Sequence, residues 1–367
     1  YPFVSARYAQ RKDTWRGKDG DVAIEIDYHP GHEFNLDRMV AGVQDALTYF
    51  TEHYGPYQHE ILRIVEFPRF SRGGGFAEPF PNSVPFNEAI GFTAKVDDRD
   101  PKDVDYPYFV TAHEVAHQWW AHQEVPGNVQ GAEFITESLS EYSALMVLKH
   151  KYGDERMRRF LRYELDRYLA GRGMEQKGEQ PLLRADGAAY VHYQKGALAL
   201  YALQDAIGED AMNDALASFL RRWRFRGPPY ATSRDLLAEL RRVTPTAQQG
   251  LIEDLFETIT LYDSRAVSAV ARGRPDGRSD VDIVVRARKV RADGAGNERD
   301  AELDALVDVG VQDAAGNWLV LEKRHVRSGE NRFTLTVDGK PARAGIDPLH
   351  KLIDRDADDN VVAVTGD

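Results

Sequence analysis

The sequence His113-Glu114-Val-Ala-His117 constrains this chain more than any other feature, because it sets two metal-binding side chains four residues apart. On a helix, residues at this spacing lie one above the other on the same face, so both imidazoles can reach one ion. Glu114 lies about 100° round the helix, too close to be a comfortable third ligand but well placed to hold a water molecule. The preceding residues, 104–112, supply a proline and then an apolar run, which predicts the start of a helix.

Glu137, in the helix-like segment 135–142, completes a ligand set. Two histidines and one carboxylate leave the fourth position of a tetrahedral zinc ion open, which is typical of a catalytic site. Zinc in such a site lowers the pKa of its water and polarises a carbonyl group. Glu114 is then expected to take the proton of the water and pass it to the leaving amine. We therefore predict one zinc ion per chain, although manganese, cobalt or nickel also fit these ligands in vitro.

The motif has an alternative interpretation as a surface helix with two histidines and a salt-bridging glutamate. The aromatic residues in the following segment, Gln118-Trp-Trp-Ala-His122, argue against this interpretation because they would bury the helix. Glu141 also has two interpretations, since it lies one turn after Glu137 on the same face. It either orients a histidine ligand or is a carboxylate on the helix surface.

These motifs resemble the gluzincin aminopeptidases of the aminopeptidase N family, over about residues 35–260. The segment Gly75-Phe-Ala77-Glu78-Pro is similar to the Gly-x-Met-Glu-Asn exopeptidase motif of that family. The resemblance implies that Glu78 binds the α-amine of a peptide, with Gly75 and Ala77 beside the substrate. It also implies a thermolysin-like zincin catalytic domain that acts on peptide substrates.

A second match is the segment Tyr193-Gln-Lys-Gly, which is similar to the Tyr-x-Lys-Gly segment of the same family. The resemblance implies that the Tyr193 phenol donates a hydrogen bond to the oxyanion that forms during hydrolysis. Tyr190 and His192 are the alternatives for this role. Without the resemblance, Tyr193 would be interpreted as an aromatic residue that packs on the core at the start of the apolar helix 197–206.

The chain departs from the family pattern in three places. Glu137 falls one residue later than is usual, which makes Glu133 a rival ligand. Pro79 stands where the exopeptidase motif has asparagine, which changes the first specificity pocket. The large N-terminal β domain of the family is absent, and this makes an open-cleft endopeptidase or oligopeptidase the first alternative function. The second alternative is a non-catalytic peptide-sensing module of a transporter.

A narrower resemblance concerns the segments 67–70, 80–92 and 261–267. They are similar to bacterial proteins in which such a peptidase module is fused to an ABC-transporter permease. The resemblance implies that this chain, which starts with Tyr1, is a soluble part of a larger membrane-anchored protein. The chain itself contains no apolar run of 18 or more residues, so we expect no membrane span within it.

Composition narrows the possible partners and ligands. The net charge of −12 argues against nucleic acid as a partner. The chain has no cysteine, so a metal ion must be bound by histidine and carboxylate side chains. A length of 367 residues is sufficient for two or more domains with their own cores.

The distribution of apolar residues predicts an α+β chain with three parts. Residues 1–35 form a residual strand and linker, with one alternating strand at 22–28. The catalytic domain, 36–262, begins with a small sheet and is then almost wholly helical from 109 to 259. Residues 263–367 form a small all-β sandwich, which is similar to the third domain of the family. Its expected strands include 281–290, 333–337 and a hairpin over 306–322.

Overall fold

The computed structural model describes residues 4–70, 76–100 and 102–366. The chain divides into two compact units. The first unit comprises Tyr1–Phe160 and Leu183–Ile252, and the second comprises Leu161–Leu182 and Glu253–Asp367. Within the described residues, no helix is both long enough and apolar enough to cross a membrane.

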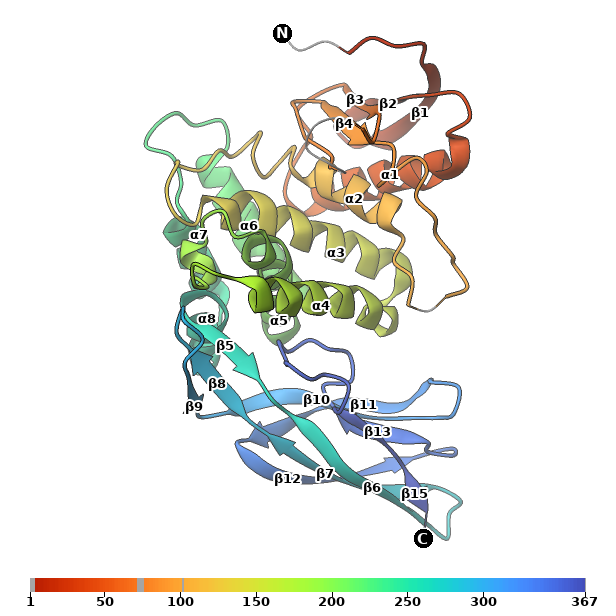
Figure 1. Cartoon of the computed structure of the whole chain (residues 1–367), viewed down its shortest axis with the longest axis vertical. Coiled ribbons are helices and arrows are strands. Elements are labelled where there is room, and N and C mark those ends of the chain that lie inside the picture. Colours follow the sequence, from red (N-terminus) through yellow and green to blue (C-terminus); the bar gives the residue numbers. More distant parts are fainter. Residues whose placement is uncertain (1–3, 71–75, 101, 367) are drawn as a thin grey trace. The chain divides into compact units, whose positions relative to one another are not determined.

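The first unit begins with a four-stranded sheet in the order β1-β2-β3-β4 (Figure 1). Its strands are β1 (Ala9–Gly17), β2 (Gly20–Tyr28), β3 (Ile61–Phe67) and β4 (Ser83–Asn87). The strands β2, β3 and β4 run parallel, whereas β1 and β2 form an antiparallel hairpin. The buried residues of β2 are aliphatic, which explains why this strand was expected from the sequence, whereas those of β3 are Leu62, Ile64 and Glu66. Strand β1 was not expected.

The helices of the first unit follow this sheet. They are α1 (Leu36–His53), α2 (Tyr106–Ala116), α3 (Leu139–Tyr152), α5 (Gly196–Ile207), α6 (Glu209–Trp223), α7 (Ser233–Val243) and α8 (Gln249–Ile252), with short helical turns η1 (Glu33–Asn35), η3 (Asp154–Arg156), η4 (Leu182–Arg184) and η6 (Thr246–Gln248). Helix α4 (Arg158–Met174) begins in this unit and continues into the second. The side chain of Asp105 caps α2 by accepting a hydrogen bond from the Tyr108 backbone N–H at 3.3 Å, and Pro107 lies in the first turn. The expected helix start before the histidines is therefore confirmed.

Two helices of the first unit begin with a π-helical turn. The π-helix η2 (Phe134–Ser138) leads directly into α3, and η5 (Tyr190–Lys195) leads directly into α5. Such turns insert an extra residue into a helix and occur frequently at functional sites. Helix α3 is buried from Leu139 to Leu148 and packs against α2 and α5. A helix buried on all sides is expected to be mostly apolar, so the polar residues Ser140, Glu141 and Ser143 stand out on α3.

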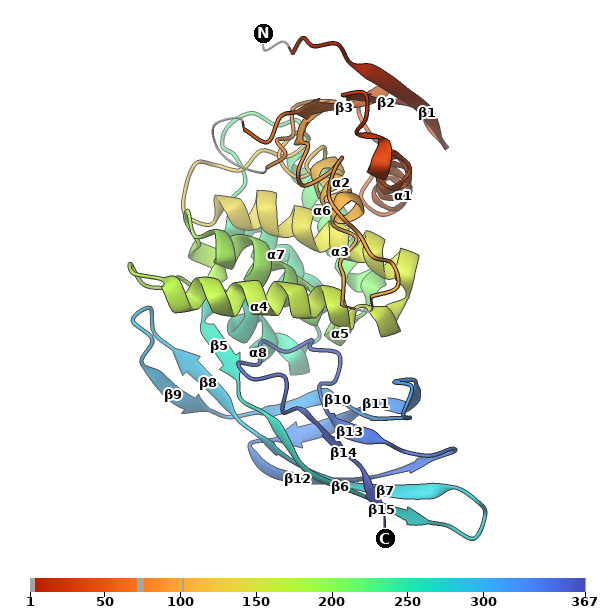
Figure 2. The same cartoon turned by 45° about the vertical axis from the view of Figure 1, so that its right-hand side comes forward.

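The second unit is rich in strands (Figure 2). They are β5 (Ile259–Tyr262), β6 (Arg265–Gly273), β7 (Ser279–Ala287), β8 (Lys289–Ala292), β9 (Glu298–Ala301), β10 (Asp304–Gln312), β11 (Trp318–Arg327), β12 (Gly329–Val337), β13 (Arg343–Ile346), β14 (Val361–Ala363) and β15 (Thr365–Gly366), preceded by the π-helix η7 (Glu253–Glu257). The sheets β11-β10-β13-β14 and β12-β7-β6-β15 contribute to one apolar core, so they form a sandwich. The expected α+β class is confirmed.

One expected strand of the second unit is in fact two. Residues 281–290 were expected to form a single strand, but the chain leaves β7 at Ala287 and forms β8 from Lys289. Strand β8 pairs with β5 and β9 in a separate three-stranded sheet. Between the two strands, the Arg288 carbonyl accepts a hydrogen bond from the Asp263 backbone N–H at 3.0 Å. The chain therefore changes sheets at Arg288, which the strand-like sequence of residues 281–290 does not reveal.

Candidate functional site

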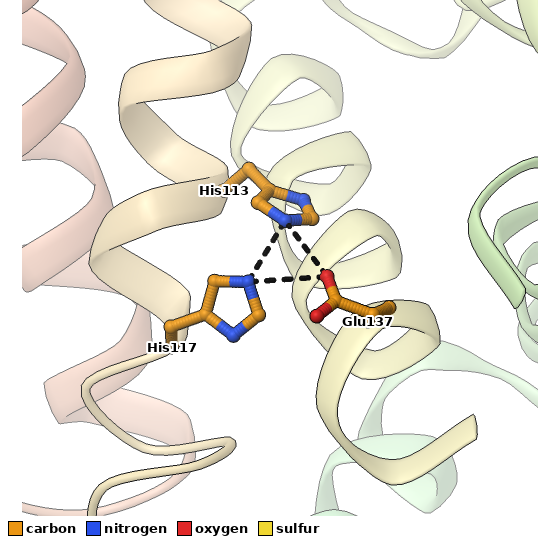
Figure 3. A group of neighbouring side chains, drawn as sticks. All are labelled: His113, His117 and Glu137. Carbon is orange, nitrogen blue, oxygen red and sulfur yellow. Dashed lines mark hydrogen bonds and ion pairs between the residues drawn. The ribbon is translucent and has the colours of Figure 1, made fainter. Parts of the chain in front are cut away.

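Three side chains, from α2, from the residue that caps its C-terminal end and from η2, converge on one point (Figure 3). The Nε2 atoms of His113 and His117 lie 2.9 Å apart. The Oε2 atom of Glu137 lies 3.5 Å from His113 Nε2 and 3.3 Å from His117 Nε2. Ligand atoms that share one tetrahedral zinc ion at ~2.0–2.1 Å are about 3.3 Å apart, so the three atoms fit this geometry. Both histidines are buried and Glu137 is half-buried.

The hydrogen-bonding partners of the two imidazoles support a cation at this point. His117 Nδ1 lies 3.0 Å from the Trp120 carbonyl oxygen, which only accepts, so Nδ1 carries the ring proton. His113 Nδ1 lies 2.5 Å from a carboxylate oxygen of Glu141, and this contact also requires a proton on Nδ1. Both Nε2 atoms are then left with lone pairs that face each other and a carboxylate oxygen. A metal ion bound by all three atoms makes such a donor set favourable.

Three groups lie close to the Nδ1 atoms of the two imidazoles. Glu141 on α3 is buried, so its interpretation as a surface carboxylate is wrong. The Trp120 carbonyl and the Ser140 hydroxyl, which lies 3.1 Å from His117 Nδ1, hold the second imidazole. Neither of these two partners was expected from the sequence. A partner that is a backbone carbonyl cannot be recognised from the residue type. Ser140, in contrast, lies next to Glu141 and three residues after Glu137, so a search of this turn for partners would have found it.

Glu114 lies beside the three ligands and is buried. Burial raises the pKa of its carboxyl to about 7, while the two neighbouring histidines oppose this rise. The negative charges of Glu137 and Glu78 also raise it, which places the Glu78 carboxylate within electrostatic range of Glu114. One carboxylate oxygen of Glu114 has no protein hydrogen-bond partner. This oxygen is therefore available to a water molecule or a substrate.

Tyr193 lies in η5, and its ring centroid is 5.8 Å from that of His113. The ring is half-buried. Burial raises the pKa of the phenol, and the carboxylates of Glu137, Glu141 and Glu114 raise it further. The hydroxyl consequently keeps its proton and is a hydrogen-bond donor at neutral pH. His192, an alternative for the donor role, instead has its Nδ1 atom 2.9 Å from Glu133.

The side chain of Glu133, the rival metal ligand, therefore contacts His192 and not the two histidine ligands. Its Oε2 atom lies 2.9 Å from His192 Nδ1 and accepts a hydrogen bond from the Gly187 backbone N–H at 2.8 Å. It is not among the side chains whose ligand atoms converge with those of His113 and His117. The choice of Glu137 over Glu133 agrees with this geometry.

The expected amine-binding segment lies along the edge of the sheet. Ala77 forms an antiparallel bridge with Phe86 of β4, and the Glu78 backbone N–H donates to the Pro85 carbonyl at 3.1 Å. The Glu78 side chain is exposed in the free protein. The backbone of residues 77–78 thus pairs with β4, the edge strand of the sheet. Gly75 lies outside the described residues.

Within the described part of the chain, one other group of three potential ligands is present, namely His32, Glu66 and Glu88. It gathers where β2, β3 and β4 end. His32 Nδ1 lies 2.5 Å from Glu66 Oε1 and 4.0 Å from Glu88 Oε2. A separation of 2.5 Å is that of a hydrogen bond and is too short for two atoms that share a zinc ion, which would be about 3.3 Å apart. We interpret His32 and Glu66 as a hydrogen-bonded pair.

Comparison with known proteins agrees with this site. The Peptidase family M1 domain matches residues 39–258, which is more than half of the chain. Aminopeptidase A of Legionella pneumophila, solved in complex with aspartic acid, superposes with a TM-score of 0.58 at 14% identity, covering 95% of this chain and 38% of that one. A point mutant of an M1 zinc metallopeptidase from Deinococcus radiodurans superposes with a TM-score of 0.50 at 17% identity, covering 68% of this chain and 52% of that one.

The chain thus spans less than two thirds of the length of either structure. At these identities the superpositions establish the fold alone. No curated protein matches the sequence. The domain match and the three convergent ligands together identify the chain: it belongs to peptidase family M1, a family of zinc metallopeptidases, and His113, His117 and Glu137 form its candidate zinc site.

Proposed function

We propose that the chain is a zinc-dependent aminopeptidase, which hydrolyses the N-terminal peptide bond of peptides. The observation that carries the proposal is the convergence of His113, His117 and Glu137 with a buried glutamate, Glu114, beside them. A zinc ion bound there supplies an acidic water and polarises the scissile carbonyl. The remaining chemistry comes from side chains of this chain.

Glu114 is the proposed general base. A carboxyl whose pKa lies near 7 accepts a proton from water at neutral pH and returns it to the leaving amine. Tyr193 is the proposed oxyanion donor, because its protonated phenol lies beside His113. Glu141 is the proposed orienting partner of His113, since its carboxylate fixes the ring and increases the basicity of Nε2.

Glu78 is the proposed anchor of the substrate amine, with Ala77 and Gly75 beside the peptide. Its carboxylate is exposed in the free protein and within electrostatic range of Glu114. A bound ammonium group would compensate its charge, whereas an acetylated N-terminus would not. The edge position of Ala77 allows an extended peptide to be positioned by backbone hydrogen bonds.

The proposal is tested with Glu114→Gln, which preserves size and removes the base. We expect the variant to bind one equivalent of zinc, as the wild type does, and to lose about 100- to 10,000-fold in turnover of a short peptide with a free N-terminus. Glu155→Gln, an identical exchange at an exposed position on η3, is the matched control and should retain full activity. Turnover by zinc-loaded Glu114→Gln at the wild-type rate would refute the mechanism.

We further propose that the peptidase works attached to a membrane permease. This proposal is supported by the segments 67–70, 80–92 and 261–267 and by their resemblance to peptidase–permease fusions. Fractionation of native cells, followed by detection with an antibody against this chain, tests it. Recovery with the membranes is expected, and recovery only in the supernatant would contradict it.

A further inference from the structure

The two π-helical turns each carry one residue of the proposed active site. Glu137 lies in η2 and Tyr193 lies in η5, and the two turns pack against each other. A π-turn forms poorer hydrogen bonds than an α-helix and persists only where its surroundings hold it. Whatever joins η2 to η5 therefore sets the position of the zinc ligand relative to the phenol.

A side-chain hydrogen bond joins the immediate neighbours of these two residues. The Ser138 hydroxyl donates to the His192 carbonyl oxygen at 2.5 Å, and both groups are buried. Ser138 follows Glu137 in the chain and His192 precedes Tyr193, so the bond connects the two site residues through one residue on each side.

A glycine brings the two segments close enough for this bond. A Cβ atom at Gly196 would lie 2.1 Å from Ser138 Oγ and 2.5 Å from Ser138 Cβ. Since no side chain fits at such distances, the start of α5 approaches η2 only because position 196 is glycine. Glycine in the first turn of a helix costs stability relative to alanine, and close approach explains its presence here.

A second connection comes from the residue before η2. Glu133 Oε2 lies 2.9 Å from His192 Nδ1 and accepts the hydrogen bond of the Gly187 backbone N–H. The His192 carbonyl is therefore hydrogen-bonded to Ser138, and its ring lies against the Glu133 carboxylate. Both partners belong to the segment that carries Glu137.

We propose that Ser138, His192 and Glu133 form a clamp that fixes Tyr193 relative to the zinc ligand Glu137, so that the phenol reaches the oxyanion. The three are positioning residues: they act through Tyr193 and do not touch the substrate. The inference rests on the proposed function and adds to it. A displacement of about 1 Å in a catalytic group costs on the order of 100-fold in rate, so loss of the clamp should be visible in turnover.

The first test removes the hydroxyl with Ser138→Ala. We expect zinc content and KM to stay within about twofold of the wild type, and kcat to fall about 10- to 100-fold. Ser143→Ala is the matched control, because Ser143 is also a buried serine of this segment, but it bonds to the Leu139 carbonyl and Trp120. The control should lower thermal stability and leave kcat unchanged.

A double-mutant cycle separates positioning from general destabilisation. If Ser138 acts only through the phenol, adding Ser138→Ala to Tyr193→Phe lowers kcat by less than about twofold. Equal losses in the presence and absence of the phenol would overturn the proposal. At position 133, Glu133→Gln keeps an oxygen that can accept from Gly187 and should retain kcat, whereas Glu133→Ala should lose it.

A readout independent of activity distinguishes failure of the clamp from failure of the proposed function. Amide hydrogen exchange in residues 190–195 should accelerate in Ser138→Ala and not in Ser143→Ala. If the wild-type protein cleaves no peptide, the proposed function fails, while faster exchange still supports the clamp. Unchanged exchange in Ser138→Ala would overturn the clamp, whatever the activity.

Discussion

Replacing Glu141 by glutamine tests how the zinc site is organised. The Glu141 carboxylate lies 2.5 Å from His113 Nδ1, and both side chains are buried. The exchange keeps the shape of the side chain and an oxygen that can accept the Nδ1 proton. It removes the negative charge that makes His113 Nε2 a better electron-pair donor. We therefore expect weaker zinc binding with an otherwise unchanged site.

The magnitude follows from the type of contact. Loss of a charged orienting partner costs about 10- to 100-fold in metal affinity, or about 1.4–2.7 kcal/mol. Glu141→Ala also leaves the buried Nδ1 proton of His113 without an acceptor, which adds about 1–3 kcal/mol to the loss. The predicted order of zinc affinity is thus wild type, then glutamine, then alanine.

Competition with a chromogenic chelator measures these affinities, and peptide hydrolysis at saturating zinc measures turnover. At saturation, the glutamine variant should regain most of the wild-type kcat, because the ligands and Glu114 are unchanged. The exposed Glu155→Gln is the matched control for loss of one negative charge. A zinc affinity of Glu141→Gln within twofold of the wild type would refute the orienting role.

Three further predictions concern catalysis, pH and metal removal. Tyr193→Phe should lower kcat by about 100- to 1000-fold, or ~2.7–4 kcal/mol, at unchanged zinc content, and a loss below tenfold in steady-state kinetics would contradict the oxyanion role. Burial raises the pKa of Asp354 from 3.8 to about 6, so the folded protein binds this proton more tightly than the unfolded chain does. The resulting contribution to the free energy of unfolding is complete below about pH 4 and is lost as the pH rises through 6. Between pH 4 and pH 7, chemical denaturation should show the wild type losing about 3 kcal/mol more than Asp354→Asn, and parallel pH profiles would contradict this. Zinc should raise the Tm of the wild type, measured by calorimetry, and should not raise that of His113→Ala, since the ion stabilises only a protein that binds it.

The parts of the site that follow from helical periodicity could be predicted from the sequence. The spacing of His113 and His117 fixes their common face, and the aromatic residues after them indicate a buried helix. Glu137 could be placed opposite the two histidines because its segment is also helical. Strand β2 could be predicted since its buried positions are aliphatic.

Features that depend on tertiary contacts could not be predicted. Strand β1 is half-buried or exposed at every position, so its sequence has no apolar face to detect. The π-turns η2 and η5 have the composition of ordinary helices, and it is the contact between them that distinguishes them. The interaction of Glu133 with His192 links residues far apart in sequence, which is why Glu133 remained a rival ligand until the structure placed it.

The most direct test of the central claim compares one short fluorogenic peptide with a free and with an acetylated N-terminus, on zinc-loaded protein. Our account predicts cleavage of the free form only, because it assigns the Glu78 carboxylate to the ammonium group of the substrate. Cleavage of both forms would contradict the aminopeptidase assignment in favour of an open-cleft endopeptidase, and cleavage of neither would contradict a catalytic role for the site.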